Sequence, residues 1–216
     1  MPRGDPRYIA IEGPIGVGKS SLAEKLAATL NARVVLEKAF DNPFLGLFYK
    51  DRKQHAFQTQ VFFLLARYQQ QLELKQQDLF QQVTVSDYVF SKDRIFASMN
   101  LSPDELTLYQ GIYRLLDARL PKPELVIYLQ ASTETLLKRI KKRGSPFEKY
   151  MDPGYLVELA EAYNQFFFGF TECELLVVNT SDIDFVKNEQ DYDNLLAAIK
   201  SPKRGQRHYL TIGQGS

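Results

Sequence analysis

A glycine-rich segment near the N-terminus constrains this chain more than any other feature. Residues 13–20 read Gly-Pro-Ile-Gly-Val-Gly-Lys-Ser and match the phosphate-binding pattern G-x-x-x-x-G-K-[ST] at every fixed position. The apolar run at residues 8–11 precedes it, as a strand should. Such a loop points backbone N–H groups and the positive end of the following helix at a phosphate. The segment therefore predicts a strand, a phosphate-binding loop (P-loop) and a helix; the alternative is a glycine-rich turn without a ligand.

Two side chains of this segment carry chemistry of their own. Lys19 would bring a positive charge to the β and γ phosphates of a nucleoside triphosphate, and Ser20 would offer a hydroxyl to Mg²⁺. The residues expected to bind ATP are Gly13, Pro14, Ile15, Gly16, Val17, Gly18, Lys19, Ser20 and Ser21.

Short apolar runs alternate with longer helical patterns along the chain. The runs are residues 7–12, 33–36, 83–85, 125–129 and 175–178, and helices are expected at about 18–31, 54–79, 102–119, 132–143, 153–170 and 190–200. A capping box at Ser102 and Glu105 marks one helix start. Apolar strands separated by helices are typical of a parallel sheet covered on both faces. The sequence predicts a doubly wound α/β fold with a five-stranded parallel sheet, one domain over residues 1–216 and an exposed, flexible tail at about 201–216.

Composition narrows the class of protein. The chain has 216 residues, 44% of them hydrophobic, and 27 Lys plus Arg against 26 Asp plus Glu, a net charge of +1. This balance disfavours a nucleic-acid partner, and no apolar run is long enough for a signal peptide or a membrane span. The single cysteine, Cys173, excludes an internal disulfide. We expect a cytoplasmic protein without a membrane partner.

Two acids follow apolar runs directly. Glu37 comes after the second run, and Asp87 after the third. In an open α/β sheet, ligands bind at the carboxyl ends of the strands, so both carboxylates should lie on the same rim as the P-loop. Asp87 has the placement of an acid that holds Mg²⁺ together with Ser20, with a turn acid as the alternative. Glu37 is a candidate general base, or an exposed strand-end carboxylate.

Two further segments carry polar candidates. Gln60 and Arg67 are two helical turns apart in an otherwise apolar helix, where they could read the edge of a base; the alternative is a polar stripe on an amphipathic helix. Residues 139–148 form a basic helix end followed by Gly, Ser and Pro. This segment predicts either a mobile lid over ATP, at about 139–150, or a solvated charged face.

Taken together, these motifs resemble the deoxynucleoside kinase family, from the P-loop to at least Tyr163. The resemblance rests on residues 12–20, Glu37, residues 42–45 and 48–49, Gln60 through Arg67, Asp87, residues 95–97, Arg139-Ile140, Arg143-Gly144 and Glu148. It implies a P-loop kinase fold with a short basic lid. Gln60 is preferred over Gln58 because the family's glutamine stands seven residues before an arginine and eleven after a tyrosine, as Gln60 does.

The resemblance also implies a role for each residue of the acceptor site. Glu37 would take the proton of the 5′-hydroxyl, Tyr49 and Glu148 would bind the sugar 3′-hydroxyl, and Gln60 would pair with the base beside Arg67. Phe96 would pack against the base. Asp87 would join Ser20 at Mg²⁺, and Arg139 and Arg143 would be catalytic cations of the lid, with Lys19 at the phosphates.

Two positions depart from the family pattern. Where many relatives have Glu-Arg-Ser after the third strand, this chain has Asp87-Tyr88-Val89, so the arginine near the 5′-hydroxyl is absent. Lys92 and Arg94 are the candidates to replace it, and the sequence does not choose between them. In the lid, Ser145 stands where a third arginine is common.

The predicted activity is ATP-dependent phosphorylation of the 5′-hydroxyl of a deoxynucleoside, in nucleotide salvage, by an enzyme that is a homodimer as its relatives commonly are. A glutamine pairs with adenine, guanine or cytosine, and the resemblance to bacterial purine deoxynucleoside kinases favours deoxyadenosine or deoxyguanosine. The donor base is expected near residues 180–184. The first alternative is a nucleoside monophosphate kinase of the thymidylate kinase type. The second is a regulatory GTP-binding switch, which the absence of an Asn-Lys-x-Asp motif disfavours.

Overall fold

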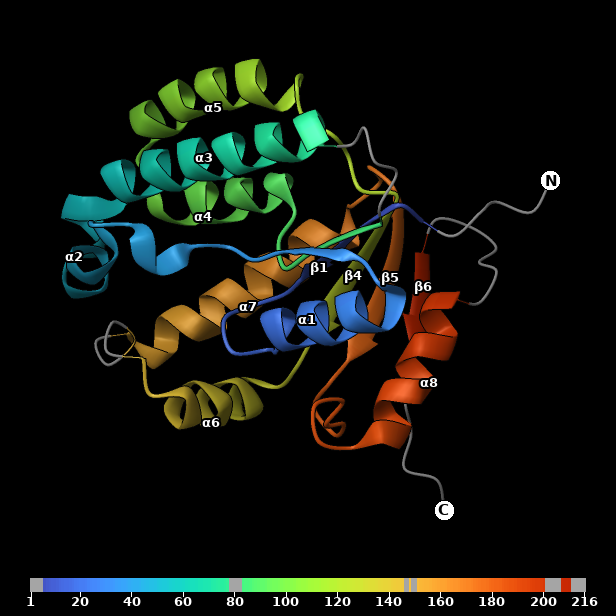
Figure 1. Cartoon of the computed structure of the whole chain (residues 1–216). Coiled ribbons are helices and arrows are strands. Elements are labelled where there is room, and N and C mark those ends of the chain that lie inside the picture. Colours follow the sequence, from blue (N-terminus) through green and yellow to red (C-terminus); the bar gives the residue numbers. More distant parts are fainter. Residues whose placement is uncertain (1–5, 78–82, 146–147, 149–150, 201–206, 211–216) are drawn as a thin grey trace.

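The computed structural model describes residues 6–77, 83–145, 148, 151–200 and 207–210. These residues form one sheet in the order β2-β3-β1-β4-β5-β6, and every neighbouring pair of strands is parallel (Figure 1). The strands are β1 (Tyr8–Glu12), β2 (Arg33–Val35), β3 (Thr84–Ser86), β4 (Leu125–Gln130), β5 (Glu174–Asn179) and β6 (Arg207–Leu210). The predicted α/β class is confirmed.

The sheet has one strand more than the five predicted. β6 pairs in parallel with β5, from Leu175 opposite Arg207 to Val178 opposite Leu210. Residues 207–210 are thus part of the sheet rather than of an exposed tail, while residues 201–206 and 211–216 lie outside the described part of the chain. The sequence hides this strand because it is only four residues long and lacks an apolar run.

All six predicted helices are present, each within two residues of its expected bounds where it is described; residues 78 and 79 fall outside the described part. They are α1 (Lys19–Leu30), α3 (Arg52–Gln77), α5 (Pro103–Asp117), α6 (Thr133–Arg143), α7 (Pro153–Phe168) and α8 (Glu189–Lys200). The Glu105 carboxylate accepts a hydrogen bond from the Ser102 N–H at 2.9 Å, which confirms the capping box. No described helix is long and apolar enough to cross a membrane.

In the described part of the chain, four short helical segments are present that the sequence does not predict. They are η1 (Ala39–Asp41), α2 (Leu45–Lys50), η3 (Phe90–Lys92) and α4 (Asp93–Asn100). They follow β2 and β3 at the carboxyl edge of the sheet. Ligands bind at this edge in open α/β sheets, so these segments lie next to the expected binding region.

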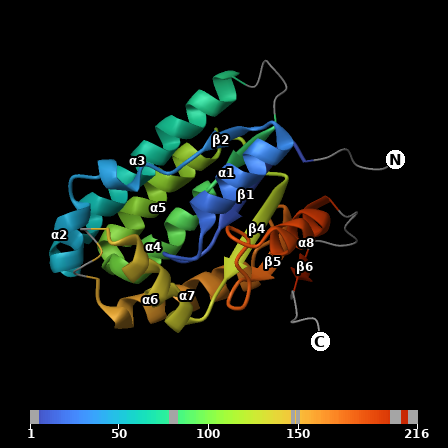
Figure 2. The ribbon, with the colours of Figure 1, turned by 60° about the horizontal axis from the view of Figure 1, so that its bottom comes forward.

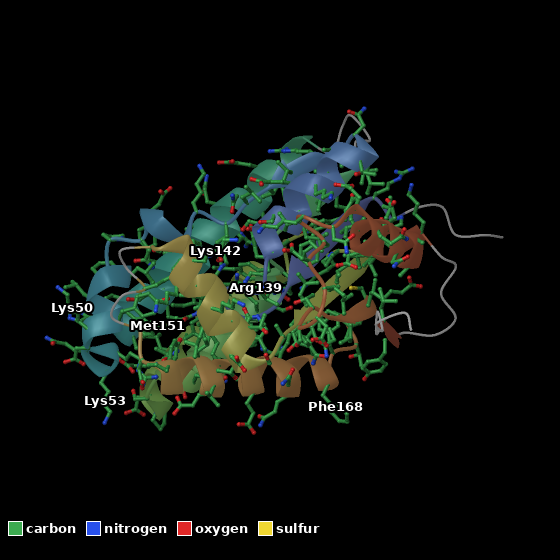
Figure 3. The ribbon with its side chains drawn as sticks, turned by 90° about the horizontal axis from the view of Figure 1, so that it is seen from below. Lys50, Lys53, Arg139, Lys142, Met151 and Phe168 are labelled. Carbon is green, nitrogen blue, oxygen red and sulfur yellow. The ribbon has the colours of Figure 1, made fainter. Side chains whose placement is uncertain are left out.

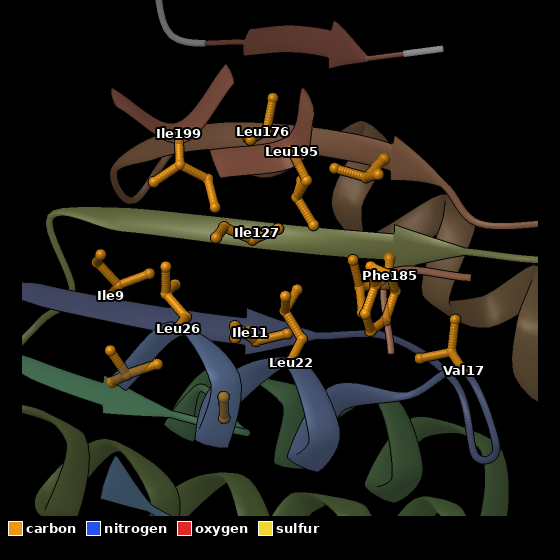
Figure 4. Close-up of a cluster of buried hydrophobic side chains, with 14 of the residues drawn as sticks. Ile9, Ile11, Val17, Leu22, Leu26, Ile127, Leu176, Phe185, Leu195 and Ile199 are labelled. Atoms are coloured by element: carbon orange, nitrogen blue, oxygen red, sulfur yellow. The ribbon is translucent and has the colours of Figure 1, made fainter. Parts of the chain in front are cut away.

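Helices cover both faces of the sheet, which explains why the strands read as near-continuous apolar runs. On one face, Ile9 and Ile11 of β1 and Ile127 of β4 pack against α1 and α8 (Figure 4). The opposite face packs against α4 and α7, with Tyr163 and Phe167 stacking on Tyr128 of β4. Figure 2 shows α1 and α8 on the same side of the strands, with α4 and α7 across them. Each fully buried leucine or isoleucine contributes about 1.5–3 kcal/mol to this core.

Candidate active site

The P-loop is held in shape by close packing at two glycines. Gly13 has φ 151°, and a Cβ there would come within 2.4 Å of the Leu129 carbonyl oxygen. Gly16 has φ 85°, and its Cβ would lie 2.7 Å from Ile140 of α6. Both backbone conformations favour glycine, and neither site has room for a side chain. The loop is therefore fixed between β4 and α6, with the concave backbone that a phosphate group requires.

Lys19 lies inside this loop. Its ammonium donates hydrogen bonds to the carbonyl oxygens of Gly13, at 2.7 Å, and Pro14, at 3.2 Å. Burial and the neighbouring ammonium of Lys92 lower the pKa of Lys19 to about 8, although Glu12 and other acids oppose the change. A phosphate group would add negative charge and favour the protonated form.

Ser20 and Asp87 lie in contact at the carboxyl edge of the sheet. The Ser20 hydroxyl donates to Asp87 Oδ2 at 2.5 Å, and the Glu37 backbone N–H donates to Asp87 Oδ1 at 2.6 Å. A hydroxyl and a carboxylate beside a phosphate loop are the oxygen ligands that Mg²⁺ prefers, so the donor set fits that ion. The pair is arranged as the sequence predicts for a metal site.

Glu37 is held by two cations. Arg67 Nε donates to its Oε1 at 2.6 Å, and Lys92 Nζ donates to its Oε2 at 2.7 Å. The Arg67 and Lys92 side chains are 5% and 2% exposed, so these ion pairs are largely shielded from water. Burial alone would raise the pKa of the Glu37 carboxyl, but Arg67 and Lys92 outweigh it and hold the pKa well below its usual range. Glu37 is therefore fixed and ionised near neutral pH.

Buried polar contacts also hold the Arg67 side chain on the side away from Glu37. Asp93, at the start of α4, contacts Arg67 Nη1 through Oδ1 and accepts a 2.6 Å hydrogen bond from the Tyr109 hydroxyl through Oδ2. The Gln60 amide donates to the Asp93 backbone carbonyl at 3.0 Å. Helices α3, α4 and α5 are thereby linked to the carboxylate at residue 37.

These groups line one cavity of about 180 Å³, which we call the central cavity. Its walls come from the P-loop, the segments after β2 and β3, and helices α2, α3, α4, α6 and α7. Figures 1 and 2 show how these helices are arranged around the sheet. Every predicted substrate-binding residue lines it, together with Lys19, Ser20 and Arg143: Glu37, Tyr49, Gln60, Arg67, Asp87, Phe96 and Glu148. Phe96 is fixed by an edge-on contact with Tyr163, at 6.1 Å between ring centroids.

Tyr49 and Glu148 lie at the end of the cavity nearest the predicted lid. Burial raises the pKa of Tyr49, and Tyr155 and Glu148 raise it further, so the phenol stays a hydrogen-bond donor. Glu148 is paired with Arg143, whose Nε lies 3.3 Å from Oε2, and its side chain is 8% exposed. Ser145 also belongs to the described part of the predicted lid, whereas residues 146, 147, 149 and 150 lie outside it.

Arg139 occupies a different place. It donates from Nη1 to the Val17 carbonyl at 3.0 Å and from Nη2 to the Thr180 carbonyl at 2.8 Å, which joins α6, the P-loop and the segment after β5. Arg139 lines a second hollow, the phosphate-loop cleft, between residues 16–21, α6 and residues 183–187. Figure 3 shows Arg139 and Lys142 along α6 on this side. The cleft overlaps the expected donor-base segment only at Ile183 and Asp184.

The chain matches the family model for deoxynucleoside kinase over residues 9–202. It belongs to the deoxynucleoside kinase family. A deoxyguanosine kinase of Bacillus subtilis is 41% identical over 198 residues, covering 89% of this chain and 96% of the relative. A deoxyadenosine kinase of Lactobacillus acidophilus is 32% identical, covering 92% and 97%. A structure of deoxyadenosine kinase from M. mycoides with bound dATP superposes with a TM-score of 0.77 at 25% identity, covering 90% of this chain and 100% of the other.

In this deoxynucleoside kinase, three charged groups of the site have a role that the sequence alone does not assign: Glu12, Lys92 and Asp93. Glu12 is fully buried, and its carboxylate accepts hydrogen bonds from the N–H groups of Gly13 and Val89, each at 2.9 Å. Its position at the end of β1, directly before the P-loop, is a signal that could have pointed to Glu12. Lys92 and Asp93 lie in the short helical segments η3 and α4, which have no such signal.

Proposed function

We propose that this enzyme transfers the γ-phosphoryl group of ATP to the 5′-hydroxyl of a purine deoxynucleoside, giving the deoxynucleoside 5′-monophosphate and ADP. The observation that carries the proposal is the central cavity, which joins the phosphate-binding residues Lys19 and Ser20 to the Glu37 carboxylate and to the polar side chains of α3. A sugar alcohol beside Glu37 would face the terminal phosphate, while its base would lie against α3 and α4.

Glu37 would orient the acceptor and take its proton. Arg67 contacts Oε1 through both Nε and Nη2, but Oε2 keeps a lone pair beyond its bond to Lys92, so the ionised group still accepts the 5′-hydroxyl hydrogen bond. The bond from O5′ to the γ-phosphorus forms as the bond to the β–γ bridging oxygen breaks, ADP leaves, and the hydroxyl proton passes to Glu37. Because the transition state is loose, the proton moves late, and a carboxylate of low pKa suffices.

The cations of the site would stabilise the charge on the migrating group. Lys19 is placed for the β and γ phosphates, and Arg143 lines both the central cavity and the phosphate-loop cleft. Ser20 and Asp87 would hold Mg²⁺, which supplies positive charge to the phosphates when bound. Arg139 contributes by holding the P-loop against the segment after β5.

Recognition of the acceptor falls to the remaining cavity residues. The Gln60 amide nitrogen donates to the Asp93 carbonyl, and the Gln60 side chain is also hydrogen-bonded to Tyr109; these contacts fix the amide and leave its oxygen as an acceptor for a base edge. Arg67 has only donors, which suits the acceptor-rich N7 and O6 edge of guanine and N7 of adenine. Tyr49 and Glu148 would bind the sugar 3′-hydroxyl, and Phe96 would pack on the base.

The rival activity is phosphorylation of a nucleoside monophosphate. Glu37 disfavours it, because a fixed carboxylate at the acceptor's 5′ end repels a phosphate there. The purified enzyme should be given ATP, Mg²⁺ and, in turn, deoxyguanosine, deoxyadenosine, deoxycytidine, thymidine, dGMP and dTMP, with ADP and the new nucleotide both measured. We expect turnover of the purine deoxynucleosides. Turnover of dGMP or dTMP alone would replace the proposal with a monophosphate kinase.

We further infer that the enzyme is a cytoplasmic homodimer. Leu108 and Leu115 of α5 are 58% and 71% exposed, and Phe168 at the end of α7 is 77% exposed and points outward (Figure 3). Tyr109 and Tyr113 of the same helix are buried in the core. Light scattering after gel filtration tests the dimer, and a mass near 24.9 kDa would contradict it.

A further inference from the structure

Lys92 is the most deeply buried lysine side chain beside the site. It ends the turn η3 after β3 and is 2% exposed, although lysine is almost never fully buried unless it is paired. The desolvation of an ammonium group costs several kcal/mol and has to be offset by nearby anions. The burial of Lys92 therefore has to be explained by the groups around its ammonium.

Two carboxyl groups lie near the Lys92 ammonium. Lys92 Nζ is 2.7 Å from Glu37 Oε2 and 3.7 Å from Glu12 Oε1. Glu12 ends β1 directly before the P-loop, and Glu37 follows β2. The ammonium thus bridges the root of the P-loop and the carboxylate of the central cavity.

The other residues near this position do not contact Glu37 Oε2. Tyr88, which stands where the family's arginine would be, is uncharged, fully buried and packed with Val35 and Leu74. The Arg94 guanidinium lies over the Tyr113 ring, 5.9 Å from its centroid. Arg67 occupies the opposite oxygen of Glu37. Among the described residues, Lys92 alone forms an ion pair with Glu37 Oε2.

We propose that Lys92 is a positioning residue for phosphoryl transfer, holding the Glu37 carboxylate in place against the P-loop. The inference rests on the proposed function. When Glu37 takes the acceptor's proton, Glu12 Oε1 remains 3.7 Å from Lys92 Nζ. The ammonium therefore keeps a second carboxyl partner while Glu37 is protonated.

The proposal predicts an effect on the reaction rather than on binding of either substrate. In Lys92→Met, we expect kcat to fall about 100-fold while the KM for ATP changes less than about 3-fold, because the lost contact acts on the group that orients the reacting hydroxyl. Lys92→Arg keeps the charge and should stay within about 10-fold of the wild-type kcat. Lys122→Met, which removes an exposed ion pair with Asp117, is the matched control and should be unchanged.

A purely structural role for Lys92 would be to neutralise Glu12. The double variant Glu12→Gln/Lys92→Met removes both charges and also guards against a single variant that does not fold. If Lys92 positions Glu37, the double variant should be about 100-fold less active than Glu12→Gln alone. Equal kcat values for these two proteins would overturn the proposal, as would a folded Lys92→Met enzyme within about 3-fold of wild type.

A second readout does not depend on turnover. The chemical shift of the Glu37 carboxyl carbon, assigned by its loss in Glu37→Gln, can be measured by NMR at neutral pH. Lys92→Met should move this signal, because Glu37 Oε2 loses its hydrogen-bond donor at 2.7 Å. An unchanged chemical shift would overturn the inference. Failure of the wild-type enzyme to phosphorylate deoxynucleosides would instead overturn the proposed function, and the NMR result would still show whether Lys92 holds Glu37.

Discussion

The central cavity and the phosphate-loop cleft lie on either side of the P-loop, yet they are built differently. In the central cavity, charged side chains fix one another: Glu37, Arg67, Lys92 and Asp93 form a buried set of ion pairs. In the cleft, Arg139 and the glycine loop work mostly through backbone carbonyls and N–H groups. The difference teaches that the proposed acceptor side depends on side-chain identity, whereas the donor side depends on backbone shape. Substitutions should therefore act on kcat or on acceptor binding in the first and on ATP binding in the second.

Glu37→Gln should give the largest effect. The amide cannot take the hydroxyl proton and no longer neutralises Arg67 and Lys92, so kcat should fall at least about 1,000-fold. ATP binding, measured by calorimetry, should persist because the P-loop does not use Glu37. A thermal melt controls for the buried cations left without a partner, and unchanged steady-state activity would remove the base assignment.

Gln60→Ala should affect only the acceptor. The base would lose its amide partner, and the KM for the deoxynucleoside should rise about 10- to 100-fold at an unchanged KM for ATP. Gln58→Ala is the matched control on the same helix, since the Gln58 amide contacts Gln54 and His55 instead. A loss confined to ATP affinity would show that Gln60 was assigned to the wrong substrate.

Arg139→Ala tests whether the cleft works as backbone architecture. Arg139 holds the P-loop to the segment after β5, so its removal should raise the KM for ATP about 10-fold with a smaller change in kcat. Lys138→Ala, one residue earlier on the exposed side of α6, should behave as wild type. A fall in kcat at constant KM would instead favour the role of Arg139 as a catalytic cation of the lid.

The smallest expected effect concerns pH. Lys19 has its pKa lowered to about 8 by burial and by Lys92, and a bound triphosphate favours its charged form. As the pH rises through about 8, the ligand-free enzyme loses this charge, and ATP affinity should weaken by a few-fold per pH unit. Deoxynucleoside affinity should stay flat in the same range, because the amide of Gln60 carries no ionisable group. Parallel losses of both affinities would contradict the assignment to Lys19.

The sequence predicted those parts of the molecule whose signals are local. The P-loop, the apolar strands and the capping box at Ser102 each lie within a few neighbouring residues. The contact of Ser20 with Asp87 was also predictable, because parallel strands bring their carboxyl ends to one edge.

Parts that depend on distant contacts were not predictable. The helix α4 has only eight residues, and β6 is stabilised by pairing with β5 rather than by an apolar pattern. Nothing in the local sequence shows that Lys92 is buried, since its partner Glu37 lies 55 positions away. The burial of a charged side chain depends on tertiary contacts that the local sequence does not show. The structure was therefore needed to choose Lys92 over Arg94 as the partner of Glu37.

Asp87 places one oxygen toward each half of the active site. Its Oδ2 accepts from Ser20 and its Oδ1 from the backbone of Glu37. The Asp87 side chain therefore connects the Ser20 hydroxyl, the proposed Mg²⁺ ligand, to the backbone of Glu37, the proposed base. Any substitution at residue 87 would therefore disturb the two halves together, and a defect seen there could never be assigned to one substrate alone.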